Sequence, residues 1–270
     1  YRSVLRGQGL EFAELRPYEP GDDVRGIDWN VTARTGALHV RRYREERART
    51  LFLLADISLS CTPATRQLLA ETAALLAFTA VACRDRLALV AFSDRLEHLV
   101  HPGSGRNHAL RLLSDLLTLS PAGRGTDLVP PLEATLALGR RPGMVILLSD
   151  GHAPLPEALL RRVGARHDLL ACVLRDDGER HLPAAGLVLC RDRESGAERL
   201  LDLSGRRGET LTEGWRRTDR ELASGLRRLA VDHTFLGSGR SPLPALRALF
   251  RARRRRPEAN SRSVRRHPSV

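Results

Sequence analysis

The stretch LFLLADISLSC, residues 51–61, begins as an apolar run and ends with a carboxylate and two hydroxyls at alternate positions. A short continuous apolar run is typical of a strand that is buried on both faces of a parallel sheet. Residues two apart in an extended strand point to the same side, so we expect Asp56, Ser58 and Ser60 to converge. The stretch therefore predicts a buried strand whose carboxyl end carries a cluster of oxygen-bearing side chains.

Apolar strands alternate with amphipathic helices along most of the chain. Strands are predicted at residues 49–56, 86–94, 143–151 and 168–176, and helices at residues 65–83, 107–119, 127–139 and 155–167. A short strand at residues 96–102 returns after a turn near Asp94 and is expected to lie antiparallel at an edge. This order predicts an α/β fold, a Rossmann-like three-layer sandwich with a mostly parallel sheet and one antiparallel edge strand.

The composition divides the chain into residues 1–49, 50–250 and 251–270. The first part is polar and rich in turn residues, and its strand at residues 38–46 is expected to feed the sheet on which the segment packs. In the second part, residues 187–203 predict a hairpin that turns at Ser195 and Gly196, followed by a helix at 217–229, a strand at 231–236 and a helix at 242–254. The last part has eight arginines and one glutamate, so it carries +7 of the net charge of +12 and predicts a disordered tail.

Several classes of protein are excluded or disfavoured by composition. The chain has no lysine, which excludes a Walker A loop, a Schiff-base lysine and the phosphate-binding lysine of aspartyl phosphatases. The apolar stretch at residues 68–83 contains Glu71 and is shorter than the roughly 20 residues of a membrane span. No signal peptide is recognisable. The four cysteines lack zinc-ligand spacing and predict reduced thiols of a cytoplasmic protein: Cys61, Cys83, Cys172 and Cys190.

Three polar positions are expected to meet where the parallel strands end, which is where ligands bind in doubly wound sheets. They are the run from Asp56 to Ser60, Thr126 in GRGTDL, and Asp150 in LLSDGH. Each alone is equally typical of a turn or helix cap. Together they supply carboxylate and hydroxyl oxygens without a soft donor, which favours Mg²⁺ or Mn²⁺ over zinc. The predicted metal ligands are Asp56, Ser58, Ser60, Thr126 and Asp150.

This set resembles the metal-ion-dependent adhesion site (MIDAS) of von Willebrand factor A domains. The resemblance rests on the D-x-S-x-S run, the separated Thr126 and the later Asp150 after an apolar strand. It implies that the three hydroxyls bind the ion directly in some states and that the two carboxylates often act through water. It also implies that a protein partner supplies a carboxylate as the last ligand.

A second resemblance covers most of the chain. GLEFAELRPYEPGDDVRGIDWNVTARTGALHVRRYREE, residues 9–46, is similar to the signature of the bacterial domain of unknown function 58, which runs into a von Willebrand factor A-like fold. Residues 176–186 and 192–198 are similar to a later segment of that family. Cys61 stands where the family usually has methionine, at a position that is not a ligand. The resemblance implies a link to AAA+ ATPases of the MoxR type and, in many relatives, membrane helices ahead of this region.

We therefore expect a metal-dependent protein interaction module that engages a MoxR-type AAA+ ATPase or its client. The alternatives are a metal-dependent phosphoester hydrolase and a weak polyanion binder that contacts nucleic acid through the arginine-rich tail. The segment PGDDVRGIDW, residues 20–29, is open to two interpretations: a salt-bridged buckle around the Trp29 indole, or a partner-binding face. His152, beside Asp150, is expected at the surface or lining the metal crevice.

Overall fold

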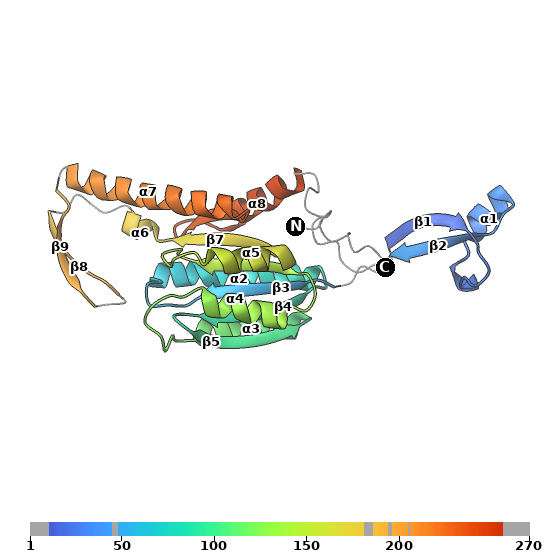
Figure 1. Cartoon of the computed structure of the whole chain (residues 1–270), viewed down its shortest axis with the longest axis horizontal. Helices are drawn as coiled ribbons and strands as arrows, with labels where there is room; N and C mark the ends of the chain where they lie inside the picture. The colour runs from blue at the N-terminus through green and yellow to red at the C-terminus, as the bar shows by residue number, and fades with distance from the viewer. Residues whose placement is uncertain (1–10, 45–47, 181–185, 194–195, 205, 256–270) are drawn as a thin grey trace.

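The computed structural model describes residues 11–44, 48–180, 186–193, 196–204 and 206–255. Its centre is a six-stranded sheet in which five strands run parallel and β5, at one edge, runs antiparallel to β4 (Figure 1). This is the arrangement that the sequence predicts. In spatial order the strands are β10 (Asp232–Gly237), β7 (Asp168–Arg175), β6 (Met144–Ser149), β3 (Thr50–Asp56), β4 (Arg86–Phe92) and β5 (Leu96–Gly103).

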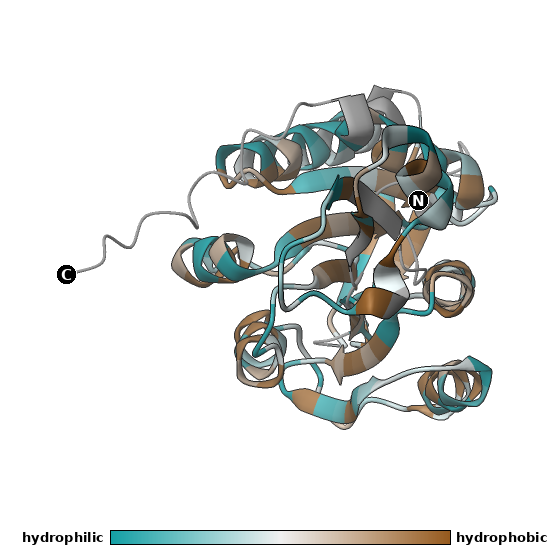
Figure 2. Cartoon of the chain, turned by 90° about the vertical axis from the view of Figure 1, so that its right-hand side faces the viewer, coloured by the Kyte–Doolittle hydropathy of each residue, from teal (hydrophilic) through white to brown (hydrophobic). Residues whose placement is uncertain are grey.

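Helices cover both faces of this sheet and complete three layers (Figure 2). One face packs against α2 (Pro63–Ala82), α3 (Arg106–Thr118) and α8 (Leu243–Arg255). The other face packs against α4 (Val129–Leu138), α5 (Glu157–Arg166) and α7 (Arg206–Arg228). Helix α2 returns the chain from the end of β3 to the start of β4, and α5 does the same between β6 and β7.

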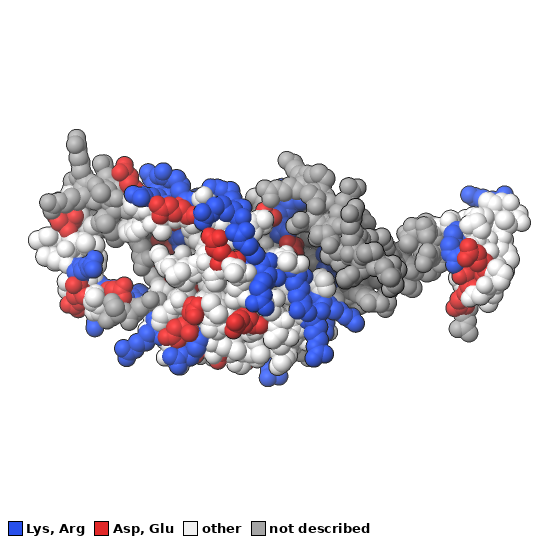
Figure 3. Space-filling model, viewed as in Figure 1, with Lys and Arg blue, Asp and Glu red and all other residues white. Residues whose placement is uncertain are grey.

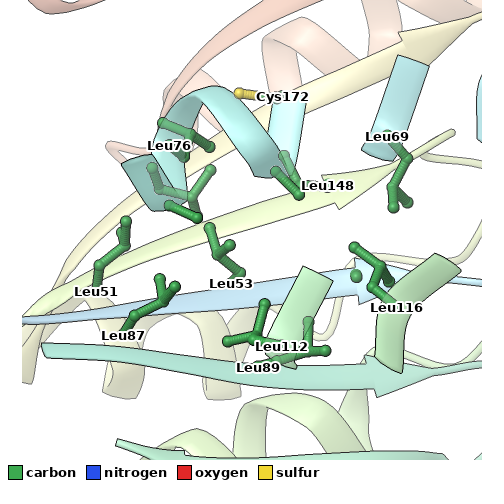
Figure 4. Packing of buried hydrophobic residues seen from close by; sticks show 14 of the residues in the cluster. Leu51, Leu53, Leu69, Leu76, Leu87, Leu89, Leu112, Leu116, Leu148 and Cys172 are labelled. Carbon is green, nitrogen blue, oxygen red and sulfur yellow. The ribbon is translucent and has the colours of Figure 1, made fainter. Parts of the chain in front are cut away.

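The side chains of β3 alternate between two buried faces of the sheet, which explains why this strand lies at the centre. Leu51 and Leu53 join the core beneath α2 and α3 (Figure 4), whereas Phe52 and Leu54 join the core on the opposite face. All four side chains are at most 2% exposed. Burying a side chain of this size contributes about 1.5 to 3 kcal/mol, so the apolar run has no alternative placement of comparable stability.

The predicted order of elements is confirmed, with two differences in length. The helix expected at residues 217–229 is α7, which begins at Arg206, because glycines at positions 208 and 214 lower the helical propensity of its first half without ending it. The tail predicted to begin at residue 251 starts later, because α8 continues to Arg255. The remainder of that tail, residues 256–270, lies outside the described residues.

The predicted hairpin is also present. Strands β8 (Leu187–Arg191) and β9 (Glu198–Asp202) pair antiparallel and follow the short helix α6 (Asp177–Arg180). Gly196 has a φ of 72°, the left-handed conformation that glycine adopts without strain, whereas Ser195 lies outside the described residues. On one face of this hairpin Leu187, Leu189 and Leu200 are each more than 60% exposed.

The N-terminal segment forms a small unit of its own. It comprises β1 (Glu11–Pro17), η1 (Val24–Gly26), α1 (Trp29–Thr35) and β2 (His39–Arg44), and β1 pairs with β2 in a separate two-stranded sheet. The strand expected to feed the main sheet therefore exists, but its predicted pairing is wrong. The predicted packing of residues 1–49 on the main sheet is not seen in the described part of the chain, and Figure 1 shows this unit beyond the point where β3 begins.

Trp29 decides between the two interpretations of residues 20–29. Its side chain is 67% exposed, so the indole does not anchor a buckle in this structure. Local polar contacts hold the segment instead: Asp28 accepts hydrogen bonds from the backbone of Asn30 and Val31, and Arg16 forms an ion pair with Asp22. The alternative of a partner-binding face stays open. Among the described helices, none combines the length and the apolar content that a membrane span requires.

Candidate metal centre

The main chain brings two of the predicted polar positions together. Strands β3 and β6 are hydrogen-bonded neighbours, with Ala55 opposite Leu148. Because both strands run in the same direction, the residues that follow this pair, Asp56 on one strand and Ser149 and Asp150 on the other, meet at the carboxyl end of the sheet.

Asp56 is fully buried and its two carboxylate oxygens have different partners. Oδ1 accepts hydrogen bonds from the Ser58 backbone at 3.1 Å and the Ser58 hydroxyl at 2.5 Å. Oδ2 accepts one from the Ser149 hydroxyl at 2.7 Å. The Ser58 and Ser60 hydroxyl oxygens are 3.0 Å apart. The D-x-S-x-S run therefore converges as predicted, with its three oxygen-bearing side chains in one connected group.

Asp150 approaches this group from the neighbouring strand. Its Oδ1 accepts a hydrogen bond from the backbone of His152 at 3.1 Å. Its Oδ2 is buried and has no hydrogen-bond partner among the described residues. Leaving a buried carboxylate oxygen without a partner is costly, so an unsatisfied oxygen at this position points to a group that the protein atoms do not provide.

The electrostatics of Asp56 and Asp150 also favour a bound cation. Burial and the nearby charge of Asp150 raise the pKa of Asp56 to about 6, although hydrogen bonds from Ser58 and Ser149 oppose the rise. Two buried carboxylates repel each other when both are ionised. A divalent cation would balance both charges and complete the coordination of the free Asp150 oxygen.

The residues present therefore fit a divalent cation. Asp56, Ser58, Ser60 and Asp150 would hold it, and such an ion would act as an acceptor for a further oxygen ligand. A carboxylate oxygen from Asp56 and one from Asp150 lie within 4.8 Å of each other and of the Cys61 sulfur. No other group of this kind occurs among the searched, described residues.

The position of the Cys61 sulfur affects which metal ion the site would prefer. The sequence-based preference for Mg²⁺ or Mn²⁺ assumed that the site had no soft donor, and the structure corrects this assumption by placing a sulfur beside both carboxylates. Burial and the two nearby carboxylates raise the pKa of the Cys61 thiol, and its proton is directed to the backbone oxygen of Asp56 at 3.5 Å. The neutral thiol is a poor ligand for Mg²⁺, but a softer ion could displace the proton.

Thr126 lies in the loop between α3 and α4 and is half-buried. The next residue, Asp127, donates a backbone hydrogen bond of 2.9 Å to the carbonyl of Ser93, directly after β4. Since β4 neighbours β3, this contact places the loop at the same end of the sheet as Asp56. The direct approach of Thr126 to the carboxylate pair stays a prediction.

A cavity of about 150 Å³ opens beside the carboxylates. It is bordered by Ser60, Asp150 and His152 on one side and by the side chains of α7 on the other, among them Trp215. His152 is exposed, as expected for a residue at the rim. A larger apolar groove of about 700 Å³ lies along α2 and the start of α8. We assign ligand binding to the smaller cavity because its lining carries more charged side chains, among them Asp150 and Asp219.

Arg175 connects α7 to the loop that contains Asp150. Its guanidinium donates to the backbone oxygen of Asp150 and forms a 2.8 Å ion pair with Asp219 of α7. Neither this residue nor Ser149 was among the residues predicted from the sequence. An arginine in an otherwise apolar strand, DLLACVLRD, and a serine directly before Asp150 were the available signals.

Comparisons with known proteins agree with the second resemblance. The family model "Protein of unknown function DUF58" matches residues 14–219. Uncharacterized proteins of Mycobacterium tuberculosis (Rv1480) and Mycobacterium bovis (Mb1516) are each 33% identical over 252 residues, which span 90% of this chain and 76% of theirs.

Solved structures are more distant. The conserved hypothetical protein BatB from Bacteroides thetaiotaomicron is 12% identical with a TM-score of 0.45, covering 77% of this chain and 98% of its own. Proximal thread matrix protein 1 from the mussel byssus, described with a zinc-occupied MIDAS motif, is 17% identical with a TM-score of 0.38, covering 47% of this chain and 38% of its own. The match of the family model to most of the chain, together with the mycobacterial relatives, shows that this protein belongs to the DUF58 family.

Proposed function

We propose that this protein is a metal-dependent protein interaction module. The observation that carries the proposal is the buried pair of Asp56 and Asp150, in which one Asp150 oxygen has no hydrogen-bond partner among the described residues. A bound divalent cation supplies a positive charge that neutralises this pair and accepts one further oxygen ligand. Mg²⁺ or Mn²⁺ is the proposed ion, with Thr126 as an additional ligand.

The cavity beside the carboxylates supports an external ligand. Ser60 and Asp150 lie on its wall, so a carboxylate from a partner protein can reach the ion from this side. Asp56 is fully buried behind Ser58 and Ser149 and serves to orient these hydroxyls. A partner carboxylate would complete the coordination of the ion by oxygen ligands, and this contact would favour docking.

The geometry disfavours the form of the hydrolase alternative in which Asp56 is the nucleophile. A nucleophilic aspartate must reach the phosphorus atom of its substrate, but Asp56 is 0% exposed and three hydrogen bonds occupy its oxygens. The phosphate-binding lysine of aspartyl phosphatases is also absent from the sequence.

The proposed partner is an AAA+ ATPase of the MoxR type or its client. This choice rests on the DUF58 resemblance and on the open ligand position at the ion. We further propose that residues 50–250 form the interaction domain and residues 1–49 a separate family-specific segment. The structure supports this division because β1 and β2 pair with each other and not with the six-stranded sheet.

The test has two stages. Isothermal titration with MgCl₂, MnCl₂ and ZnCl₂ should show one site in the wild type and none in Asp150→Ala, with Asp115→Ala as a control that removes a carboxylate from α3. A purified MoxR-type ATPase from the same genome should then bind in the presence of Mg²⁺ and lose affinity with EDTA. Removal of the Ser58, Ser60 or Thr126 hydroxyl should weaken docking without unfolding the domain. Equal docking with and without chelator would refute a role for the ion in recognition.

A further inference from the structure

Exposed arginines gather at the amino end of the six-stranded sheet, the end opposite the candidate metal centre. Each of the five parallel strands begins beside one or two of them. In the spatial order of the strands these residues are Arg227 and Arg228 beside β10, Arg166 beside β7, Arg140 and Arg141 beside β6, Arg49 beside β3, and Arg84 and Arg86 beside β4. We call this set the arginine row; Figure 3, a view from the side of the sheet, shows basic side chains lying among uncharged and acidic ones.

Few carboxylates balance the arginine row, although Arg228 pairs with Glu157 at 3.2 Å. Asp85 is buried and accepts a hydrogen bond of 2.9 Å from the backbone of Arg49. Asp168 and Asp232, at the starts of β7 and β10, both contact Arg253 of α8. Within the described chain, Arg84 and Arg141 form no ion pair, so the row carries an excess of positive charge.

Stabilisation of helix ends accounts for part of this arrangement. Helices α2, α4, α5 and α7 end at the amino end of the sheet, and arginines near helix C-termini interact favourably with the helix dipole. Arg49 directly precedes β3 and Arg86 is the first residue of β4, so neither lies at a helix end. The row is therefore more extensive than the helix ends require.

We propose that the arginine row binds the phosphate backbone of duplex nucleic acid without reading its sequence. Neighbouring strands are about 4.8 Å apart, so five strands give a row of about 20 Å. Phosphates along one strand of a duplex follow each other at about 3.4 Å of helix axis, so this length faces about six of them. Phosphates of both strands on the side of the duplex that faces the row lie within its length, and arginine can donate two parallel hydrogen bonds to a phosphate.

A duplex fits this surface better than a membrane. The exposed leucines that could insert into lipid, Leu187, Leu189 and Leu200, lie on the β8–β9 hairpin, beyond the opposite end. Beside the strand starts the described residues include no exposed aromatic side chain, so single-stranded bases have no stacking platform there.

Helix α8 reaches the same end of the sheet, and an arginine-rich sequence follows it in the chain. Arg253 contacts the first residues of β7 and β10, so α8 ends at the amino end of the sheet. The sequence that follows adds Arg256, Arg262, Arg265 and Arg266. The sequence alone led us to expect polyanion binding through the tail. With α8 ending at this surface, binding would depend on the folded domain as well as on the tail.

The test is the salt dependence of binding to a fluorescein-labelled 20-base-pair DNA, measured by anisotropy between 50 and 200 mM NaCl in EDTA. In the double variant Arg84→Gln/Arg141→Gln, the slope of log K against log salt should fall by about 1.8, the value for two lost phosphate contacts. The matched control Arg111→Gln/Arg240→Gln removes two exposed arginines away from the row and should keep the wild-type slope. Duplexes of unrelated sequence should compete equally.

Three outcomes would overturn the proposal. Equal slopes in the two double variants would show that the row makes no contact. Complete loss of binding in a chain ending at Arg255 would assign binding to the tail alone. Binding to vesicles with 30% phosphatidylserine, under conditions in which the duplex does not bind, would identify a membrane surface. Asp150→Ala should bind the duplex like the wild type, so failure here is distinguishable from failure of the metal proposal.

Discussion

The two ends of the six-stranded sheet carry opposite charge. The carboxyl end holds the buried pair Asp56 and Asp150 together with Asp94, Asp127 and Asp176, whereas the amino end carries the arginine row. Parallel strands produce this separation, because the loops that follow the five parallel strands lie at one end and the loops that lead into them lie at the other. Helix N-termini favour carboxylates and helix C-termini favour arginines, so the fold stabilises both groups where they stand.

The two ends also differ in how deeply their charges are buried. At the carboxyl end, Asp56 and Asp150 are enclosed and hydrogen-bonded, so changing one disturbs its neighbours. Charges of the arginine row are exposed to water and largely independent of one another. Substitutions should therefore have large effects on stability at the first end and small effects at the second, and the following experiments measure this difference.

The largest effect is expected at the ion pair between Arg175 and Asp219. Asp219→Ala leaves a guanidinium that is 9% exposed without its carboxylate, which should cost about 3 to 5 kcal/mol of the free energy of unfolding. Urea denaturation measures the loss. The matched control is Glu157→Ala, whose pair with Arg228 is exposed and should contribute about 1 kcal/mol or less. Equal losses in the two variants would contradict the difference in burial.

The second effect concerns pH in the metal-free protein. The folded-state pKa of Asp56, about 6, lies above its ordinary value of 3.8, so folding favours the protonated form. This contribution to stability is fully present below pH 3.8 and is lost as pH rises through 6. In EDTA, Asp56→Asn should therefore equal the wild type near pH 4 and exceed it by on the order of 3 kcal/mol at pH 7.5. A difference that does not change with pH would contradict the raised pKa.

The third effect is stabilisation of the wild type by a bound metal ion, which offsets its lower stability relative to Asp56→Asn in EDTA. At 100 times its dissociation constant, one ion should stabilise the wild type by about 2.7 kcal/mol and raise its melting temperature by about 5 to 10 °C. Asp150→Ala should show no such shift in a magnesium titration followed by differential scanning fluorimetry. A shift of equal size in this variant would place the ion elsewhere.

A fourth, smaller effect separates the candidate ions. Cys61→Ala removes the sulfur near both carboxylates, so Zn²⁺ affinity should fall about tenfold, or about 1.4 kcal/mol. Binding of Mg²⁺ and Mn²⁺ should change less than twofold, because a neutral thiol contributes little to a hard ion. Calorimetric titration of each ion measures this, and Cys172→Ala, at a buried thiol in the core, is the control. Unchanged zinc affinity would show that Cys61 is not a ligand.

The smallest effect is expected in the arginine row. Arg84→Gln/Arg141→Gln should change the free energy of unfolding by about 0.5 kcal/mol or less, because both side chains are exposed and form no ion pair with the described residues. Thermal melts at low and moderate salt measure this. A loss above 1 kcal/mol would mean that the row exists chiefly to stabilise helix ends.

Much of the candidate site was predictable from the sequence. The run from Asp56 to Ser60 has a period of two that fixes which side chains share a face, and an apolar strand before Asp150 brings it to the same end of the sheet. Partners such as Ser149 and Arg175 were not predictable, because hydrogen bonds between separate strands and helices depend on register and crossing geometry. The soft donor Cys61 was missed for the same reason, since a loop after a strand can fold back by any path.

The sequence by itself determined the α/β class, the order of the elements and the oxygen-rich strand ends, since hydrophobic periodicity and chain direction are local properties. The tertiary structure alone decided that β1 and β2 form a separate sheet, that Trp29 is exposed and that Cys61 lies beside the carboxylate pair. It also assembled distant arginines, from Arg49 to Arg228, into one row. Strand pairing and side-chain exposure depend on which apolar surfaces are buried against each other. That choice involves contacts between residues far apart in the chain.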